Sequence, residues 1–153
     1  MAHTTRDEAD VQALQTHMWE CWNHRDAAGM AALFTDDGSL VGFDGSQING
    51  RSAIEASMGA IFADHTPASY IGKTREVRFL SDEAAIVRAV AGMIPPGKTD
   101  IKPENNSIIS LIAVKRDSVW KVALYHNTPA RFDGRPEAVQ ELTDEMRALL
   151  RNP

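Results

Sequence analysis

Apolar residues near the start of the chain recur at the spacing of a helix. Residues three or four positions apart form one stripe, which consists of Val11, Leu14, Met18, Cys21 and Trp22. Just before this stripe, Thr5 and Glu8 fit a capping box, in which each side chain binds the other residue's backbone N–H group. The pattern predicts a first helix that begins at Thr5.

Shorter elements follow. Asp26 is suited to cap a brief second helix. Residues 36–38 (Asp-Asp-Gly) are typical of a turn, although paired carboxylates can also do acid–base chemistry. Residues 39–43 then predict a short strand, and Asp44-Gly45 indicates a hairpin turn. A third helix is expected after Gly50, with an apolar face made of Ile54, Met58, Ile61 and Phe62.

The second half of the chain is rich in strand-forming residues. Four segments bounded by turn residues predict strands, namely Tyr70–Leu80, Ala84–Ile94, Asn105–Lys115 and Val119–Asn127. A last amphipathic helix is expected over Pro136–Leu150. Helices first and antiparallel strands later indicate an α+β fold with separate layers.

Two of these strands are apolar on both faces. In Ala84–Ile94, for example, Val87 lies on one face and Ile86 on the other, and Asn105–Lys115 has the same character. Helices can cover one face of the sheet, and a second copy of the chain is the simplest cover for the other. We therefore expect a homodimer through the sheet.

Composition narrows the class of protein. The 153 residues suffice for one domain, and a net charge of −5 disfavours nucleic-acid binding, which depends on basic patches. The single Cys21 excludes an internal disulfide and fits a reducing cytoplasm. The polar N-terminus does not resemble a secretory leader, and no apolar run reaches the roughly 18 residues of a membrane span. We expect a cytoplasmic location and no membrane contact.

Three motifs carry a resemblance to a known superfamily. Residues 33–38 (LFTDDG) resemble the turn before the first strand of SnoaL-like domains, residues 49–54 (NGRSAI) the start of their third helix, and residues 120–129 (WKVALYHNTP) their last strand. The order of elements is similar to that of nuclear transport factor 2-like proteins, and the His-Asn-Thr-Pro ending resembles the SgcJ/EcaC group. The resemblance implies a cone, in which N-terminal helices packed on a curved antiparallel sheet enclose a pocket.

The same resemblance implies boundaries and a function. It covers residues 5–132 as a single SnoaL-like domain and leaves residues 133–153 as a C-terminal helical extension. Proteins of the SgcJ/EcaC group are encoded with enediyne and other polyketide pathways. We expect a cofactor-independent enzyme of cyclase, isomerase or dehydratase type that acts on a hydrophobic polyketide intermediate. A carrier that shields such an intermediate and a structural dimerisation module are the alternatives.

Ketosteroid isomerase shares this fold and uses a carboxylate base with a tyrosine and a protonated aspartate as donors. Aligned by motif, these groups fall near Gly42, Met18 and Ser110, so all three are missing. This argues against that mechanism, and the glycine leaves room for a ligand. The alignment and the first apolar stripe predict a ligand-binding set, which is Met18, Trp22, Leu40, Asn106, Ser110, Tyr125 and Asn127.

Tyr125 and His126 are the candidate catalytic residues. Neighbours on a strand point to opposite faces, so His126 faces away from a pocket that Tyr125 lines unless the strand end bends. A histidine has a pKa suited to general base work, and its alternative role is a hydrogen bond at a dimer surface. Trp22 is either a stacking wall for a ligand or an ordinary core residue.

No cofactor motif is present in the sequence. No two histidines have the spacing of metal ligands, and Gly42–Gly45 lacks the glycine pattern of a dinucleotide site. We therefore expect no metal, nicotinamide or flavin. The expected partner is a hydrophobic small molecule.

Overall fold

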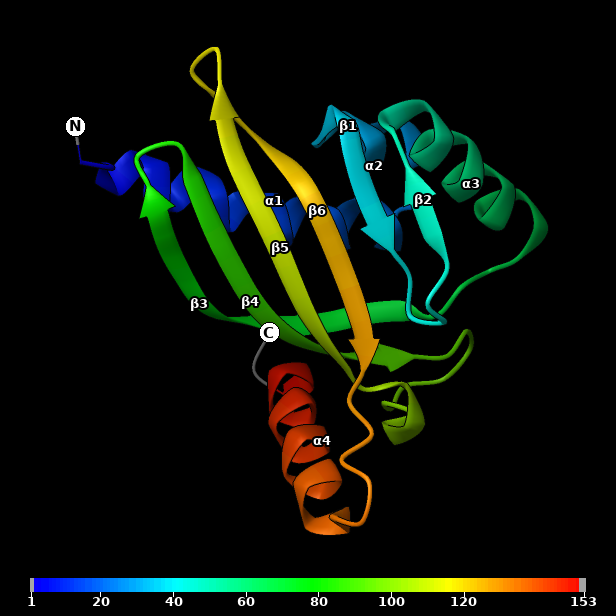
Figure 1. Ribbon diagram of the computed structural model, residues 1–153. Helices are drawn as coiled ribbons and strands as arrows, with labels where there is room; N and C mark the ends of the chain where they lie inside the picture. Colours follow the sequence, from blue (N-terminus) through cyan, green and yellow to red (C-terminus); the bar gives the residue numbers. More distant parts are fainter. Residues whose placement is uncertain (1, 152–153) are drawn as a thin grey trace.

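The computed structural model describes residues 2–151, which form one curved sheet with helices on both faces (Figure 1). The helices are α1 (Thr5–Asn23), α2 (Ala27–Ala32), α3 (Arg51–Asp64) and α4 (Pro136–Arg151), with a 3-10 turn η1 (Pro103–Asn105). The strands are β1 (Phe34–Val41), β2 (Gln47–Asn49), β3 (Ser69–Ser81), β4 (Ala84–Ile94), β5 (Ser107–Arg116) and β6 (Val119–Pro129). The expected α+β fold is confirmed.

The six strands lie in the order β2-β1-β6-β5-β4-β3. All neighbours are antiparallel except β1 and β6, which run parallel. The expectation that all neighbouring strands are antiparallel is therefore wrong for this one pair. No hairpin joins β1 to β6, because α3 and four strands intervene, and so their directions need not alternate.

Strand β1 begins earlier than the sequence predicts. Residues 36–38 lie within this strand and not in a turn. The pairing of β1 with β6 shifts its register at these residues. Asp36 lies 2.6 Å from the guanidinium of Arg51, and Asp37 lies 3.6 Å from that of Arg116. The two carboxylates thus form ion pairs on the surface of the fold, which is a structural role.

Helix α1 is capped one residue earlier than predicted. The backbone N–H of Asp7 donates to the Thr4 hydroxyl at 3.0 Å, and the backbone N–H of Thr4 donates to the Asp7 carboxylate at 2.9 Å. These residues form the capping box in place of Thr5 and Glu8. Two threonines in succession offer both choices, and the tertiary contacts of Asp7 favour the earlier one.

The Asp7 carboxylate joins the start of α1 to the β5–β6 hairpin. It accepts hydrogen bonds from the Trp120 indole at 2.9 Å and from the Lys115 ammonium at 3.1 Å. The bond from Trp120, the backbone bond from Thr4 and the bond from Lys115 all favour the charged form, so they hold the pKa of Asp7 well below its usual range.

The middle and the end of α1 are also attached to the sheet. The fully buried Gln15 side chain donates to the hydroxyl of Tyr125 at 3.0 Å. The Asn23 side chain accepts from the backbone N–H of Tyr70 at 2.8 Å and donates to its carbonyl at 3.0 Å. Polar contacts therefore hold α1 against the sheet at three points along its length.

The main core lies between α1–α3 and the inner face of the sheet. Val11, Leu14 and Met18 of the predicted stripe are buried in it, whereas Cys21 and Trp22 pack at its edge. The opposing residues of the sheet and of α3 include Phe34, Ile54, Leu111 and Val122. The predicted stripe thus faces the protein interior, as its spacing indicates.

Helix α4 covers one end of the outer face of the sheet (Figure 1). Its residues Leu142 and Met146 pack in a second apolar cluster with Val90 of β4. The carboxylate of Glu145 receives two hydrogen bonds from Arg75 of β3. Part of the face that we expected a second copy to cover is therefore covered by the chain's own C-terminal helix.

A row on the outer face remains half-exposed, and we propose that a second copy packs on it. Ile86, Ile112 and Leu124 lie opposite one another on neighbouring strands in this row. Ile112→Arg places a charge in the centre of such a symmetric contact and should give a monomer. Thr16→Arg on the exposed side of α1 should remain a dimer. A wild-type mass of one chain, in light scattering at low micromolar concentration, would contradict the proposal.

Asp7→Ala should lower the melting temperature by several degrees at neutral pH, because it leaves the donors around the carboxylate unpaired. The pKa of Asp7 is lower in the folded protein than in the unfolded chain, where it is about 3.9. The ionised carboxylate therefore stabilises the fold at pH values above about 3.9, and this contribution is lost as the pH falls toward the pKa of the folded protein. The difference from wild type should therefore shrink between about pH 5 and about pH 2. Thermal unfolding followed by circular dichroism measures it. Asp10→Ala, an exposed control, should change little, and equal stability of Asp7→Ala and wild type at pH 7 would sink the argument.

Candidate functional site

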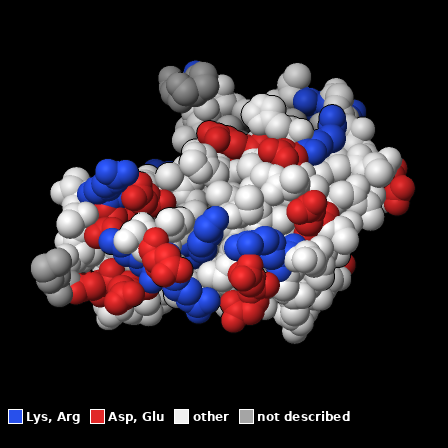
Figure 2. Space-filling view, turned by 90° about the horizontal axis from the view of Figure 1, so that it is seen from above, with Lys and Arg blue, Asp and Glu red and all other residues white. Residues whose placement is uncertain are grey.

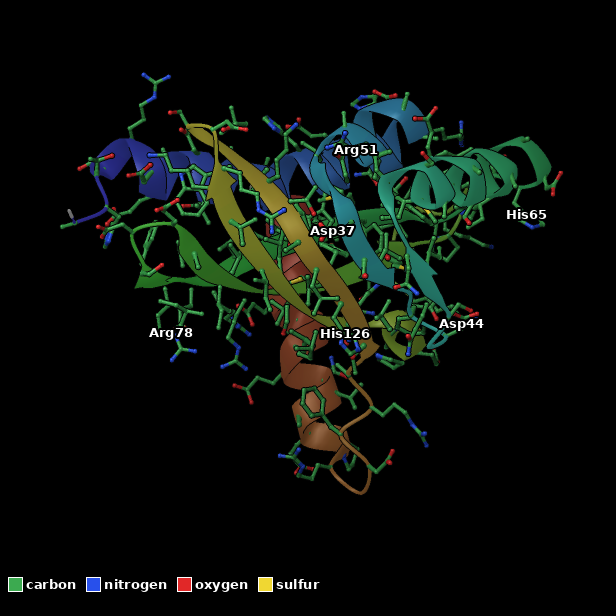
Figure 3. All side chains as sticks on the ribbon, turned by 45° about the horizontal axis from the view of Figure 1, so that its top comes forward. Asp37, Asp44, Arg51, His65, Arg78 and His126 are labelled. Carbon is green, nitrogen blue, oxygen red and sulfur yellow. The ribbon has the colours of Figure 1, made fainter. Side chains whose placement is uncertain are left out.

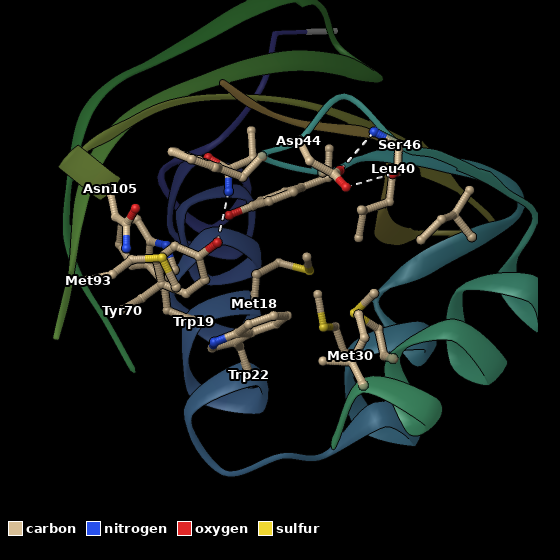
Figure 4. A pocket seen from close by; sticks show the side chains of 17 residues that line it. Met18, Trp19, Trp22, Met30, Leu40, Asp44, Ser46, Tyr70, Met93 and Asn105 are labelled. Carbon is tan, nitrogen blue, oxygen red and sulfur yellow. Dashed lines mark hydrogen bonds between the residues drawn. The ribbon is translucent and has the colours of Figure 1, made fainter. Parts of the chain in front are cut away.

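A cavity of about 370 Å³ lies between α1–α3 and the inner face of the sheet (Figure 4). This volume is within the range of small-molecule sites. Side chains from both helices and strands line it: Met18, Trp19, Trp22, Met30, Leu40, Gly42, Phe43, Asp44, Ser46, Ile48, Met58, Ile61, Tyr70, Met93, Asn105, Tyr125 and Asn127. Most of its wall is apolar, with a few polar groups at defined places.

Methionines and aromatic rings form the apolar wall. Four of the six methionines of the chain line the cavity, namely Met18, Met30, Met58 and Met93. Trp22 is held in place, because its indole N–H donates to the carbonyl of Ala68 at 2.8 Å and its ring packs edge-on against Phe62 and Tyr70. Thioethers are adaptable and contact aromatic rings favourably, so the wall suits a flat apolar ligand.

Two tyrosine hydroxyls form a polar corner inside the cavity. Tyr125 accepts a hydrogen bond from Gln15 at 3.0 Å, and Tyr70 accepts one from Asn127 at 2.8 Å. Among the hydrogen bonds of residues 2–151, neither phenol proton has an acceptor, and the amide oxygens of Gln15 and Asn127 are also unpaired. Burial raises the pKa of Tyr70 to about 12 and also raises the pKa of Tyr125, so both stay protonated at neutral pH. A carbonyl oxygen is the matching acceptor for these two donors.

Asp44 is the only carboxylate among the described residues that line the cavity. It lies in the β1–β2 hairpin (Figure 3), exposed to solvent, and accepts hydrogen bonds at 2.9 Å from both the backbone N–H and the hydroxyl of Ser46. These bonds lower the pKa of Asp44, so it is ionised at neutral pH. The cavity therefore has a proton acceptor at its rim. The sequence indicated only a hairpin turn here.

The cavity brings together five of the residues predicted to bind a ligand, which are Met18, Trp22, Leu40, Tyr125 and Asn127. Gly42 also lines it, where the sequence indicated free space. The prediction did not include Tyr70, because it lies at the start of its strand, where alternation is weakly defined. It also did not include Met30, Met58 and Met93, which come from three separate elements.

Three predicted site residues lie outside the cavity. Ser110 is exposed on the outer face of the sheet, on β5. His126 is exposed opposite it on β6 (Figure 3), as its alternation with Tyr125 predicts, so its side chain does not reach the cavity. Asn106 is buried, but its amide donates to a threonine of α4 at 2.8 Å. The sequence alignment was one residue out of register on β5, and a one-residue slip moves every side chain to the other face. Asn105 lines the cavity instead.

In the part of the chain that the structure describes, no group of three or more His, Cys, Asp or Glu side chains is arranged to hold a metal ion. Figure 2 shows acidic and basic side chains intermixed on one face of the molecule. Among residues 2–151, no helix combines the length and the apolarity needed to cross a bilayer. Apolar walls and convergent polar groups coincide at the cavity.

Gly42→Leu should fill the cavity without disturbing the fold. A Cβ at this position would lie 3.5 Å from the Asp44 carboxylate and 3.8 Å from the Ser46 carbonyl, which are ordinary contacts. Naphthalene should bind wild type, as measured by tryptophan fluorescence, and bind the variant at least about tenfold more weakly. Ala53→Leu adds the same side chain on the exposed side of α3 and serves as the control. Equal affinity in wild type and Gly42→Leu would show that the ligand binds elsewhere.

Solved structures resemble most of the chain. A cystatin-like domain of unknown function from Nostoc punctiforme has a TM-score of 0.81 and 25% identity, and the match covers 97% of this chain and 99% of that one. A cystatin-like protein from Caulobacter vibrioides has a TM-score of 0.68 and 26% identity, over 84% and 93%. A ketosteroid isomerase-like protein from Erwinia carotovora has a TM-score of 0.65 and 17% identity, and the match covers 83% of this chain and 98% of that one. These likenesses confirm the nuclear transport factor 2-like cone.

No curated protein shows significant similarity to the chain. A sequence model of the SnoaL-like domain matches residues 3–126, which is most of this chain. The matched range includes nearly all of the three motifs described above. The match does not distinguish the SgcJ/EcaC group from other members. The chain belongs to the family of SnoaL-like domains.

Proposed function

We propose that the protein is a cofactor-independent enzyme of the isomerase or cyclase type that acts on a hydrophobic ketone. One observation carries this proposal: a single apolar cavity has an ionised carboxylate, Asp44, at its rim and two protonated phenols, Tyr70 and Tyr125, in its wall. Such groups can remove a proton beside a carbonyl and stabilise the charge that develops on its oxygen. The SnoaL-like family and the ketosteroid isomerase-like relative support this type of chemistry.

In the proposed reaction, the hydroxyls of Tyr70 and Tyr125 donate hydrogen bonds to the carbonyl oxygen of the ligand. Asp44 accepts a proton from the carbon next to this carbonyl. The electron pair of the broken C–H bond forms the C=C bond of an enolate, and the carbonyl π electrons move to oxygen. Where the ketone is β,γ-unsaturated, the enolate extends into the neighbouring C=C bond, and return of the proton to the γ carbon moves that bond into conjugation with the carbonyl, which completes an isomerisation. Attack of the enolate carbon on a second carbonyl closes a ring, and the proton then goes to the new alkoxide.

These three residues do not occupy the positions that align with the catalytic groups of ketosteroid isomerase. Gly42 and Met18, which align with two of the catalytic groups of ketosteroid isomerase, carry no acid or phenol, and neither do the residues of β5 on either side of Ser110. The proposed base, Asp44, lies two residues after Gly42. The proposed phenols, Tyr70 and Tyr125, lie on β3 and β6. His126 has no part in it, because its side chain lies on the outer face.

We further propose that the ketone is a polyketide intermediate, with an enediyne pathway as the narrower assignment. Polyketide chains carry carbonyls on alternate carbons, so an apolar skeleton with an acidic C–H bond is their common chemistry. The resemblance of residues 120–129 to the SgcJ/EcaC group supports this assignment. A wall of methionines and Trp22 that suits flat conjugated molecules supports it as well. The working form would be a cytoplasmic homodimer.

A non-catalytic carrier is the second candidate. Asp44 is exposed at the rim, and its hydrogen bonds from Ser46 lower its pKa, which weakens it as a base. A cavity with an apolar wall and only a weak base would bind a reactive ketone and shield it from solvent without changing it. The two candidates share the ligand and differ in proton transfer at carbon.

Exchange of deuterium into 2-tetralone, an apolar ketone with acidic C–H bonds, distinguishes them. Wild type in D₂O should accelerate the exchange, followed by NMR. Asp44→Asn should lower the rate by about 100-fold or more, because it removes the base, while the ketone still binds. Asp64→Asn, an exposed carboxylate at the end of α3, is the matched control. If wild type binds the ketone but does not accelerate exchange, the enzyme proposal is wrong and the carrier remains.

A further inference from the structure

The indole N–H of Trp19 is buried and has no hydrogen-bond partner within residues 2–151. The ring lines the cavity, as that of Tyr70 does (Figure 4). It lies near enough to the Tyr125 hydroxyl to oppose the rise in the pKa of that group, but not in hydrogen-bonding geometry. A buried donor without an acceptor is unfavourable, so this N–H is poised for an acceptor that a ligand brings.

Gly72 of β3 determines where this indole lies. A Cβ at position 72 would lie 2.4 Å from Cζ2 and 2.6 Å from Cη2 of Trp19, far inside van der Waals contact. The six-membered ring of the indole therefore occupies the space that a side chain would take. Because the indole is rigid, any larger residue at position 72 would displace the whole ring, together with its N–H group.

We propose that Gly72 and Trp19 form a positioning pair, in which the glycine places the indole N–H beside the Tyr70 and Tyr125 hydroxyls as a third donor to the ligand. Three donors that converge on one corner suit a carbonyl oxygen, which offers two lone pairs and no proton, and the enolate oxygen formed from it, which offers three. The pair thereby makes the cavity selective for a ketone over a hydrocarbon of the same shape. This inference rests on the proposed function, because it assigns the carbonyl of that ligand to this corner.

Two ligands of matched shape test the role of Trp19. They are 2-acetylnaphthalene, which has the carbonyl, and 2-ethylnaphthalene, which lacks it, with dissociation constants from equilibrium dialysis. Wild type should prefer the ketone. Trp19→Phe should reduce this preference by about two- to tenfold, the worth of one hydrogen bond, and leave the hydrocarbon affinity within about twofold. In Trp19→Phe, the infrared carbonyl stretch of the bound ketone should shift from its frequency in wild type toward its frequency in an apolar solvent.

Gly72→Ala tests the positioning role. It should reduce the ketone preference as Trp19→Phe does, because the displaced N–H no longer reaches the ligand. Gly59→Ala in α3 is the matched control, since its Cβ would meet that of Ala27 at 4.0 Å. In the double variant Trp19→Phe/Gly72→Ala, the glycine substitution should cause no further loss of preference, because no N–H remains to be positioned.

The outcomes separate this inference from the proposed function. An unchanged ketone preference and an unchanged carbonyl frequency in Trp19→Phe would overturn the inference, even if Gly72→Ala fails to fold. If both ligands bind wild type equally, the inference is wrong, whereas deuterium exchange into 2-tetralone with the Asp44→Asn variant still decides on the proposed function. If neither ligand binds wild type, the proposed function fails together with the inference.

Discussion

Helix α1 is held against the inner face of the sheet by hydrogen bonds at its start, middle and end, and the rest of the structure depends on this attachment. Asp7 binds the β5–β6 hairpin, Gln15 binds Tyr125, and Asn23 binds the backbone of Tyr70. Hydrogen bonds are directional, so they fix the position of the helix along its axis and its rotation more strictly than apolar packing does. The helix in turn carries one wall of the cavity, which consists of Met18, Trp19 and Trp22.

The same contacts prepare the polar corner for a ligand. Gln15 and Asn127 each use a tyrosine oxygen as an acceptor, which orients the ring and leaves its proton free. Burial keeps both phenols protonated, because the charged form would lose its solvation. Bonds that stabilise the fold therefore also create the donors at the site, and substitutions at the two amides will affect stability and binding together. The exposed Asp44 lies apart from this network, at the rim.

Local patterns in the sequence were sufficient to predict most of the fold. The apolar stripe of α1 and the bounds Ala84–Ile94 agree with the structure, because period and turn residues are local signals. The site was predicted in part: Tyr125 and Asn127 line it, whereas Ser110 and His126 lie outside. Which face of a strand is inside depends on register, and register is set by contacts between distant segments. Neither the parallel β1–β6 pair nor the role of α4 as a cover is encoded in a local pattern.

A crystal structure of the protein with 2-acetylnaphthalene tests the central claim most directly, which is that the corner at Tyr70 and Tyr125 binds a carbonyl oxygen inside an apolar cavity. The account predicts the ligand oxygen within hydrogen-bonding distance, about 2.5–3.0 Å, of both hydroxyls, with the rings against Trp22 and the methionines. A ligand bound with its oxygen directed to solvent at the rim, or bound outside the cavity, would contradict it.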